Sequence, residues 1–202
     1  MQRPLLALAL ALALVLALAG AASAQSAGTA ADHEALRKLK AEATEALNKR
    51  DYVAAERLLA KPFAATTITQ DSFTDFAKLK TWFEGLYSRD FLRLKSMTLA
   101  AEADELSAIH TGTFALTRGS TRERYEMADG RVFDLNGRWT AVSIKDGTDW
   151  KLLGIHTGVN FLDNPVVAAI EKSLIWFGLG GGVIGLILGF AGGWFMRRPR
   201  RA

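Results

Sequence analysis

The chain has 202 residues, half of them hydrophobic, with 25 Lys and Arg, 21 Asp and Glu, three His and no cysteine. Without cysteine, thiolate zinc sites, cysteine nucleophiles and iron–sulfur clusters are excluded. Arg3 and the four arginines within 197–201 account for the basic excess, which leaves 20 basic against 21 acidic residues elsewhere. The sequence therefore predicts no nucleic-acid-binding surface.

The N-terminus has the pattern of a secretory signal peptide. Arg3 precedes a run of mostly Leu and Ala over residues 5–19, and Ala22-Ser23-Ala24 has the small-residue pattern that signal peptidase cuts. We predict a signal peptide over 1–24 and a flexible lead over 25–31. An uncleaved membrane span is the alternative, and the small residues favour cleavage.

Between the two ends, residues 32–163 have the length of one domain. Capping residues and apolar spacing predict three helices, which begin at Asp32, at Asp51 and at Thr74 or Asp75. The second helix is expected to close at Lys61-Pro62. These helices form the first half of the predicted domain.

The second half is predicted to form a sheet. Strands are expected over 63–69, 92–101, 108–117, 138–145 and 150–159, with the charged segment 119–137 as a loop excursion and Asp146-Gly147 as a turn. Helices followed by strands indicate the α+β class: a curved antiparallel sheet wrapped around about three N-terminal helices, followed by a single C-terminal transmembrane helix.

Leu174 to Met196 is an uncharged segment of 23 residues, and it is followed by the basic tail 197–202. At ~1.5 Å per residue, such a helix crosses a ~30 Å hydrocarbon core, and arginines just beyond it favour the cytoplasmic side. With 164–173 as linker, these features predict a single-pass protein of a bacterial cytoplasmic membrane. Its domain lies outside the cytoplasm, in the periplasm or at the cell exterior, and the lipid bilayer is one partner.

Four glycines recur every fourth residue in this segment: Gly181, Gly185, Gly189 and Gly193. Such a stripe lets a second helix approach closely, so we predict self-association as a homodimer or higher oligomer. The alternative is that glycine is simply common in membrane helices.

The closing strands carry a family resemblance. Arg138 to Gly147, Trp150 to Leu153 and His156 resemble the closing hairpin of the nuclear transport factor 2-like superfamily, which includes SnoaL-like cyclases and ketosteroid isomerase-like proteins. Ala46 to Tyr52 resembles its first helix leading into a short second one. The resemblance covers 32 to about 161 and implies a cone-shaped, cystatin-like fold with a pocket. It does not fix a function, because this scaffold hosts enzymes and binding modules alike.

His156 is the candidate catalytic residue. It has the same strand parity as Trp150, Leu152 and Gly154, so it could exchange a proton in a pocket that this face lines. A histidine with a purely structural hydrogen bond is the alternative. The candidate ligand-pocket residues are Trp82, Tyr87, His110, Arg138, Trp139, Trp150 and His156. An outer-face salt bridge is the alternative for Arg138, and core packing is the alternative for the tryptophans.

No metal and no cofactor is predicted, because no H-x-H or H-E-x-x-H spacing joins the three histidines. No carboxylate or tyrosine matches the base and oxyanion hole that ketosteroid isomerase-like catalysis requires. The sequence therefore favours a non-catalytic module that binds a small hydrophobic ligand or a protein. One alternative is an isomerase, cyclase or dehydratase of a small hydrophobic substrate that uses His156; another is a domain that only sets the oligomeric state.

Overall fold

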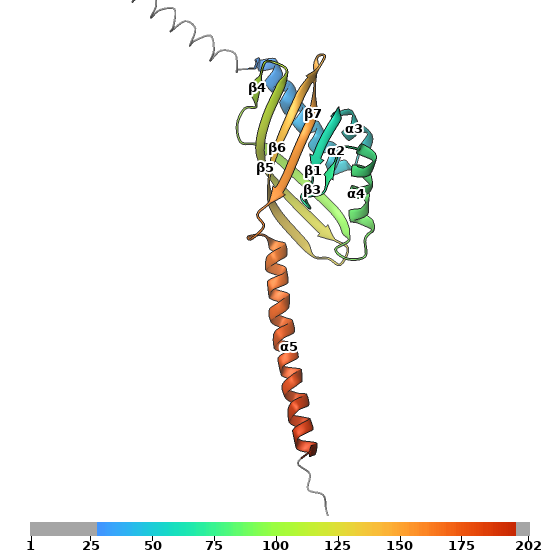
Figure 1. Cartoon of the computed structure of the whole chain (residues 1–202), viewed down its shortest axis with the longest axis vertical. Helices are drawn as coiled ribbons and strands as arrows, with labels where there is room; N and C mark the ends of the chain where they lie inside the picture. Colours follow the sequence, from blue (N-terminus) through green and yellow to red (C-terminus); the bar gives the residue numbers. More distant parts are fainter. Residues whose placement is uncertain (1–27, 197–202) are drawn as a thin grey trace, which may run out of the picture. The chain divides into compact units, whose positions relative to one another are not determined.

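The computed structural model describes residues 28–196, with elements labelled in Figure 1. The chain divides into one compact unit that ends at Val159 and a second that begins at Asn160. The predicted signal peptide and the basic tail lie outside the described residues. The elements in chain order are α2 (Ala30–Lys49), α3 (Tyr52–Arg57), β1 (Leu59–Thr66), β2 (Ser72–Phe73), α4 (Phe76–Ser88), β3 (Leu94–Ala103), β4 (Ala108–His110), β5 (Phe114–Met127), β6 (Val132–Asp146), β7 (Asp149–Val159) and α5 (Pro165–Met196).

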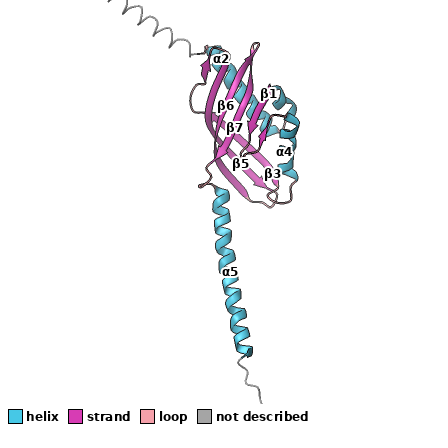
Figure 2. Ribbon diagram, in the orientation of Figure 1, coloured by secondary structure: helices cyan, strands magenta, loops and turns pink. Residues whose placement is uncertain are grey.

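The first unit is a seven-stranded sheet with three helices on its inner face (Figure 2). The strand order is β2-β1-β7-β6-β5-β3, and β4 pairs with β5 outside this path. Every pair is antiparallel except β1 with β7, which run parallel. The predicted α+β class with a curved sheet is confirmed. The parallel pair was not predicted. It forms because β1, which follows α3, lies beside β7, the last strand of the chain.

The helix starts follow local capping chemistry. α3 and α4 begin at the predicted caps Asp51 and Asp75, whose side chains accept hydrogen bonds from backbone N–H groups of the first turn. The predicted cap of α2 is wrong: Thr29 is the N-cap, and Asp32 is the third helical residue of a capping box. The Thr-x-x-Asp pattern carries this signal, since an acidic side chain can bond back to the cap.

Two strand predictions are also wrong. The charged segment 119–137 is not a loop, because β5 and β6 run through it. Its side chains alternate: Arg122 and Arg124 are exposed, while Thr121 and Glu123 are buried. The alternation was missed in the sequence because the buried positions 121 and 123 are polar too. The predicted strand 108–117 is divided by a turn at 111–113, which is why β4 and β5 are separate.

The inner face is the face of the sheet that the helices cover. At one end of it, which we call the sealed half, packed apolar side chains exclude solvent. Leu36 and Leu39 of α2 pack there with Ile109, Ala115 and Trp150. These five residues form one cluster of the buried apolar core of the unit, and Ile109 is 1% exposed. Burial of this kind contributes roughly 25 cal/mol per Å² of apolar surface, so this half anchors α2 to the sheet.

A half-buried ion pair joins the start of α2 to the β6–β7 hairpin. Asp32 Oδ1 accepts hydrogen bonds from Lys145 Nζ at 2.7 Å and from Trp150 Nε1 at 3.2 Å. Lys145, and then Thr29, hold the pKa of Asp32 well below its ordinary value. The first turn of α2 is thereby fixed to the strands that carry Lys145 and Trp150.

The other end of α2 is fixed to the edge strand β3. Asn48 Nδ2 donates to the carbonyl of Leu99 at 2.8 Å, and the Leu99 N–H donates to Asn48 Oδ1 at 2.7 Å. Lys40 Nζ donates to the carbonyl of Ala101 at 2.9 Å. The helix thus satisfies edge groups that would otherwise be free to pair with another chain. This contact also fixes the end of α2 just before Arg50.

The second unit contains α5, which is long and apolar enough to cross a membrane by length and composition. It is helical from Pro165, so most of the predicted linker 164–173 belongs to the same helix. Trp176 and Trp194 are separated by about 27 Å along the axis at 1.5 Å per residue. That spacing is close to the thickness of a bilayer core, and tryptophan is enriched at the boundaries of such cores.

Candidate functional site

The predicted face of His156 is wrong. Val142 pairs with Gly154 but Ser143 pairs with Leu152, so a β-bulge lies between these two pairs. An extra residue in one strand reverses the alternation beyond it. Trp150 and Leu152 therefore face inward, whereas His156 faces outward.

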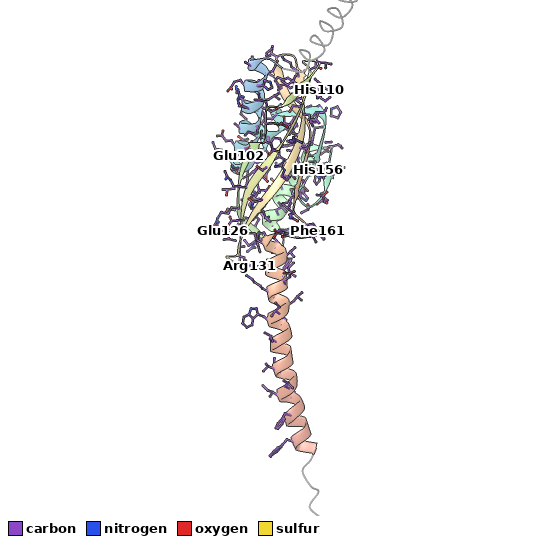
Figure 3. The ribbon with its side chains drawn as sticks, turned by 90° about the vertical axis from the view of Figure 1, so that its left-hand side faces the viewer. Glu102, His110, Glu126, Arg131, His156 and Phe161 are labelled. Atoms are coloured by element: carbon purple, nitrogen blue, oxygen red, sulfur yellow. The ribbon has the colours of Figure 1, made fainter. Side chains whose placement is uncertain are left out.

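On the outer face, His156 lies opposite Thr140 of β6 and Thr66 of β1, and it is exposed to solvent (Figure 3). His110 is also exposed, at one end of the sheet, with its ring centroid 5.4 Å from that of Phe114. The two histidines lie at separate points of the domain in Figure 3. An acid–base role for His156 stays a prediction, and its surroundings provide no shielding from water.

The structure gives most of the other predicted pocket residues a defined partner. Arg138 forms a two-bond ion pair with Asp104 on the outer face and lowers the pKa of that carboxyl group. Trp82 Nε1 donates to Asp71 Oδ2 at 3.0 Å. Trp139 is buried on the inner face, where its Nε1 donates to the carbonyl of Ser120 at 3.1 Å. Trp150 belongs to the sealed half.

A carboxylate that the sequence did not single out lies on the inner face. Glu123 of β5 is 8% exposed. Its Oε1 accepts a hydrogen bond from Thr121 Oγ1 at 2.6 Å, and its Oε2 accepts one from the Tyr125 hydroxyl. Within residues 28–194, it forms no ion pair. A buried carboxylate without a counter-ion costs free energy, so a functional reason is needed to retain it.

Space for this carboxylate is provided by Gly137 of β6, which pairs with Thr121. A Cβ atom on Gly137 would lie 2.4 Å from Thr121 Oγ1 and 3.1 Å from Glu123 Oε1. Any side chain at this position would displace the two hydrogen-bonded groups. Because Gly137 has no side chain, the side chains of Thr121 and Glu123 can occupy the space next to it on β6.

Tyr125 contacts this carboxylate directly, and the other two tyrosines of the chain, Tyr87 and Tyr52, are linked to it only through Tyr125. Burial, and then the charge of Glu123, raise the pKa of Tyr125 far above its ordinary value. Burial also raises the pKa of Tyr87, which is close enough to Tyr125 to raise that pKa further. Tyr52 acts on Tyr87 in the same way, and its hydroxyl oxygen is buried without a hydrogen-bond partner among the described residues.

Arg50 completes the group, with its guanidinium carbon 4.0 Å from the centroid of the Tyr87 ring. We call the whole group the inner polar cluster: Arg50, Tyr52, Tyr87, Thr121, Glu123 and Tyr125. In contrast to the sealed half, Arg50 is exposed, and α4, which carries Tyr87, contains no fully buried residue. The cluster thus combines a buried carboxylate with neighbours that solvent reaches.

The cluster can accept and donate hydrogen bonds. A carboxylate has about four lone-pair sites, and Thr121 and Tyr125 use two of those of Glu123. The remaining sites suit a ligand that donates a hydrogen bond. Within the part of the chain described by the structure, no group of three or more His, Asp or Glu side chains could hold a metal ion.

One sequence signal could have identified this site. Thr121, Glu123 and Tyr125 alternate in the order that places all three on one face of a strand. The signal was lost because the segment was assigned to a loop. Tyr87 is the only predicted pocket residue that belongs to the cluster.

Comparisons with known proteins identify the fold. No protein-family model matches the sequence, and no curated protein matches it. Among solved structures, a protein of unknown function with a cystatin-like fold from Nostoc punctiforme shares 15% identity, covers 69% of this chain and 98% of that chain, and has a TM-score of 0.54. A member of the nuclear transport factor 2-like family from Streptomyces avermitilis has 12% identity, coverage of 63% and 96%, and a TM-score of 0.53.

A hexachlorocyclohexane dehydrochlorinase is also similar, with 8% identity, coverage of 65% of this chain and 86% of that chain, and a TM-score of 0.56. The domain therefore has the nuclear transport factor 2-like, cystatin-like fold. At these identities the likeness concerns the fold alone, so the function must be argued from the site.

Proposed function

We propose that this protein is a membrane-tethered domain that binds a small, largely apolar molecule at the inner polar cluster without transforming it. The observation that carries the proposal is Glu123, a buried carboxylate held by two hydroxyl donors and by no cation of the described chain. A ligand that donates a hydrogen bond would use its free lone pairs. The exposed Arg50 and half-buried Tyr87 mark the side from which it enters.

The proposed location is the outer side of a bacterial cytoplasmic membrane. The signal-peptide pattern of residues 1–24 supports export, and the arginines of the tail support a cytoplasmic C-terminus. The length and composition of α5 support a single membrane span between them. In this arrangement the cluster faces the periplasm or the cell exterior.

Replacing Glu123 by glutamine is expected to weaken binding of phenol, a small apolar hydrogen-bond donor, about tenfold. The amide removes the negative charge, and hydrogen bonds to charged acceptors are stronger than neutral ones. The full chain in lipid nanodiscs, labelled with ¹³C-tyrosine, would report binding through three signals, because the chain has three tyrosines. Tyrosine-to-phenylalanine variants would assign them.

The matched control is Glu126→Gln, which makes the same change on the same strand but on the outer face, where Lys95 pairs with Glu126 at 2.7 Å. We expect phenol affinity to be unchanged in this variant. If Glu123→Gln binds phenol as tightly as the parent does, or if phenol shifts no tyrosine signal, the proposed function is wrong.

We also propose that α5 mediates self-association through its glycine stripe. Gly185→Leu, alone or with Gly189→Leu, is expected to weaken dimerisation about tenfold, because the leucine side chain prevents the close approach of the two helix backbones. Energy transfer between labelled chains in lipid vesicles would measure it. Gly180→Leu is the control, since position 180 lies on the opposite side of the helix. If the Gly185 and Gly180 variants dimerise equally well, the helices do not associate through the glycine stripe.

An enzyme is the second candidate, favoured by the same carboxylate. Glu123 beside Tyr125 has the composition of an acid–base pair in a shielded site, which isomerases and dehydratases require. In that case Glu123, rather than the exposed His156, would move the proton. Chemical change of a bound ligand, lost in Glu123→Gln, would distinguish this candidate from simple binding.

A further inference from the structure

Arg50 occupies a backbone position that normally favours glycine. It caps the C-terminus of α2 with φ 55° and ψ 33°, in the left-handed region. For a residue with a Cβ atom this conformation costs about 1 kcal/mol, and glycine is the usual choice. The presence of arginine is therefore a reason to look for what its side chain does.

The guanidinium of Arg50 stacks on Tyr87 and has no hydrogen bond or ion pair within the described residues. The nearby carboxylate of Glu84 lies 3.8 Å from Lys80 instead. Six other exposed arginines on this domain have carboxylate partners, whereas Arg57, Arg89 and Arg93, like Arg50, have none among the described residues; the six are Arg37, Arg118, Arg122, Arg124, Arg131 and Arg138. The five N–H donors of Arg50 thus remain available at the open side of the cluster.

A second unsatisfied group lies beside it. The Tyr52 hydroxyl is close enough to the Arg50 guanidinium for their polar contact to raise the pKa of Arg50, but the two groups do not meet hydrogen-bond geometry, and the buried hydroxyl has no other partner in the described chain. Lys80 Nζ lies 5.5 Å from the centroid of the Tyr52 ring and adds positive charge. An unpaired buried hydroxyl costs roughly 1–3 kcal/mol, and an acceptor oxygen between Tyr52 and Arg50 would satisfy both donors.

We propose that Arg50 and Tyr52 bind an anionic oxygen group of the ligand, a carboxylate or a phosphate, while its other end donates a hydrogen bond to Glu123. This inference rests on the proposed function. The cluster has a cationic end at Arg50, which stacks on Tyr87, and an acceptor end at Glu123, to which Tyr125 donates. A guanidinium offers a planar fork that matches such an anion. The ligand is therefore bipolar, with an anion at one end and a donor at the other.

The test compares para-hydroxybenzoate with its methyl ester, which keeps the hydroxyl but lacks the negative charge. The ¹³C-tyrosine-labelled full chain in phosphatidylcholine nanodiscs is titrated with each. We expect the acid to bind at least tenfold more tightly than the ester and to shift the Tyr52 signal. Arg50→Gln should remove that preference, so that the acid binds no more tightly than the ester. Arg57→Gln, which removes one exposed charge outside the cluster, should keep the preference.

A parallel arm identifies the source of the anion. In phosphatidylglycerol nanodiscs without added acid, a lipid phosphate at the site would shift the Tyr52 signal in the parent but not in Arg50→Gln. An unchanged signal there, with tight binding of the acid, assigns the anion to a free small molecule. Both results support the inference.

Equal affinity for acid and ester, or equal weakening of both by Arg50→Gln, would overturn it. If the ester still binds in a Glu123-dependent manner in that case, the proposed function stands and only the anion site fails. If neither probe nor phenol shifts a tyrosine signal, the two proposals fail together.

Discussion

Replacing Gly119 by alanine is expected to lower the free energy of unfolding by about 3 kcal/mol, near the upper end for overpacking. A Cβ atom at Gly119 would lie 2.0 Å from the backbone oxygen of Glu102 and 2.6 Å from Trp139 Cε2. The first of these atoms belongs to the paired strand β3 and cannot rotate away. Denaturant unfolding of the full chain, followed by tryptophan fluorescence, would measure the loss.

Gly158→Ala is the control for this substitution. Gly158 lies in β7 of the same sheet, and a Cβ atom there would meet nothing within 4 Å. We expect this variant to be at least as stable as the parent, because alanine has less backbone entropy to lose than glycine. If the Gly119 and Gly158 variants were equally stable, the close approach of β3 and Trp139 to Gly119 would not be as the structure shows.

Tyr125→Phe is expected to cost about 2 kcal/mol at neutral pH, since hydrogen bonds to charged groups contribute about 1.5–3 kcal/mol. The change removes one of the two donors to Glu123 and leaves the carboxylate buried. Tyr87→Phe is the matched control, because the Tyr87 hydroxyl makes no hydrogen bond to a described residue. We expect it to cost well under 1 kcal/mol in the same unfolding measurement.

The Tyr125 variant also has a pH signature. The pKa of Tyr125 is raised in the folded state above its ordinary 10.0, by burial first and by Glu123 next. A raised folded pKa contributes stability that is fully present below pH 10 and is lost as pH rises further. The parent should therefore lose stability above pH 10 more steeply than Tyr125→Phe. Identical alkaline profiles would mean that Tyr125 is not shielded as the structure shows.

The candidate site was the hardest part of this protein to predict from sequence. Glu123 lies in a stretch with many charged residues, and only pairing with β3 and β6 shows that it faces inward. Arg50 and Tyr52 were noted only as part of a resemblance between helices. Their proximity to Tyr87 depends on where α4 lies relative to the turn between α2 and α3, a long-range arrangement that local spacing does not encode.

The sequence by itself determined the features that depend on neighbouring residues. These are the uncharged C-terminal segment that forms α5, the caps at Asp51 and Asp75, and the concentration of helices in the first half of the domain and of long strands in the second. Tertiary structure alone decided which side chains meet. A single bulge in β7 turned His156 outward, and the pairing of β5 turned Glu123 inward. Strand register is set by contacts between distant segments, and a shift of one residue exchanges the two faces of a sheet.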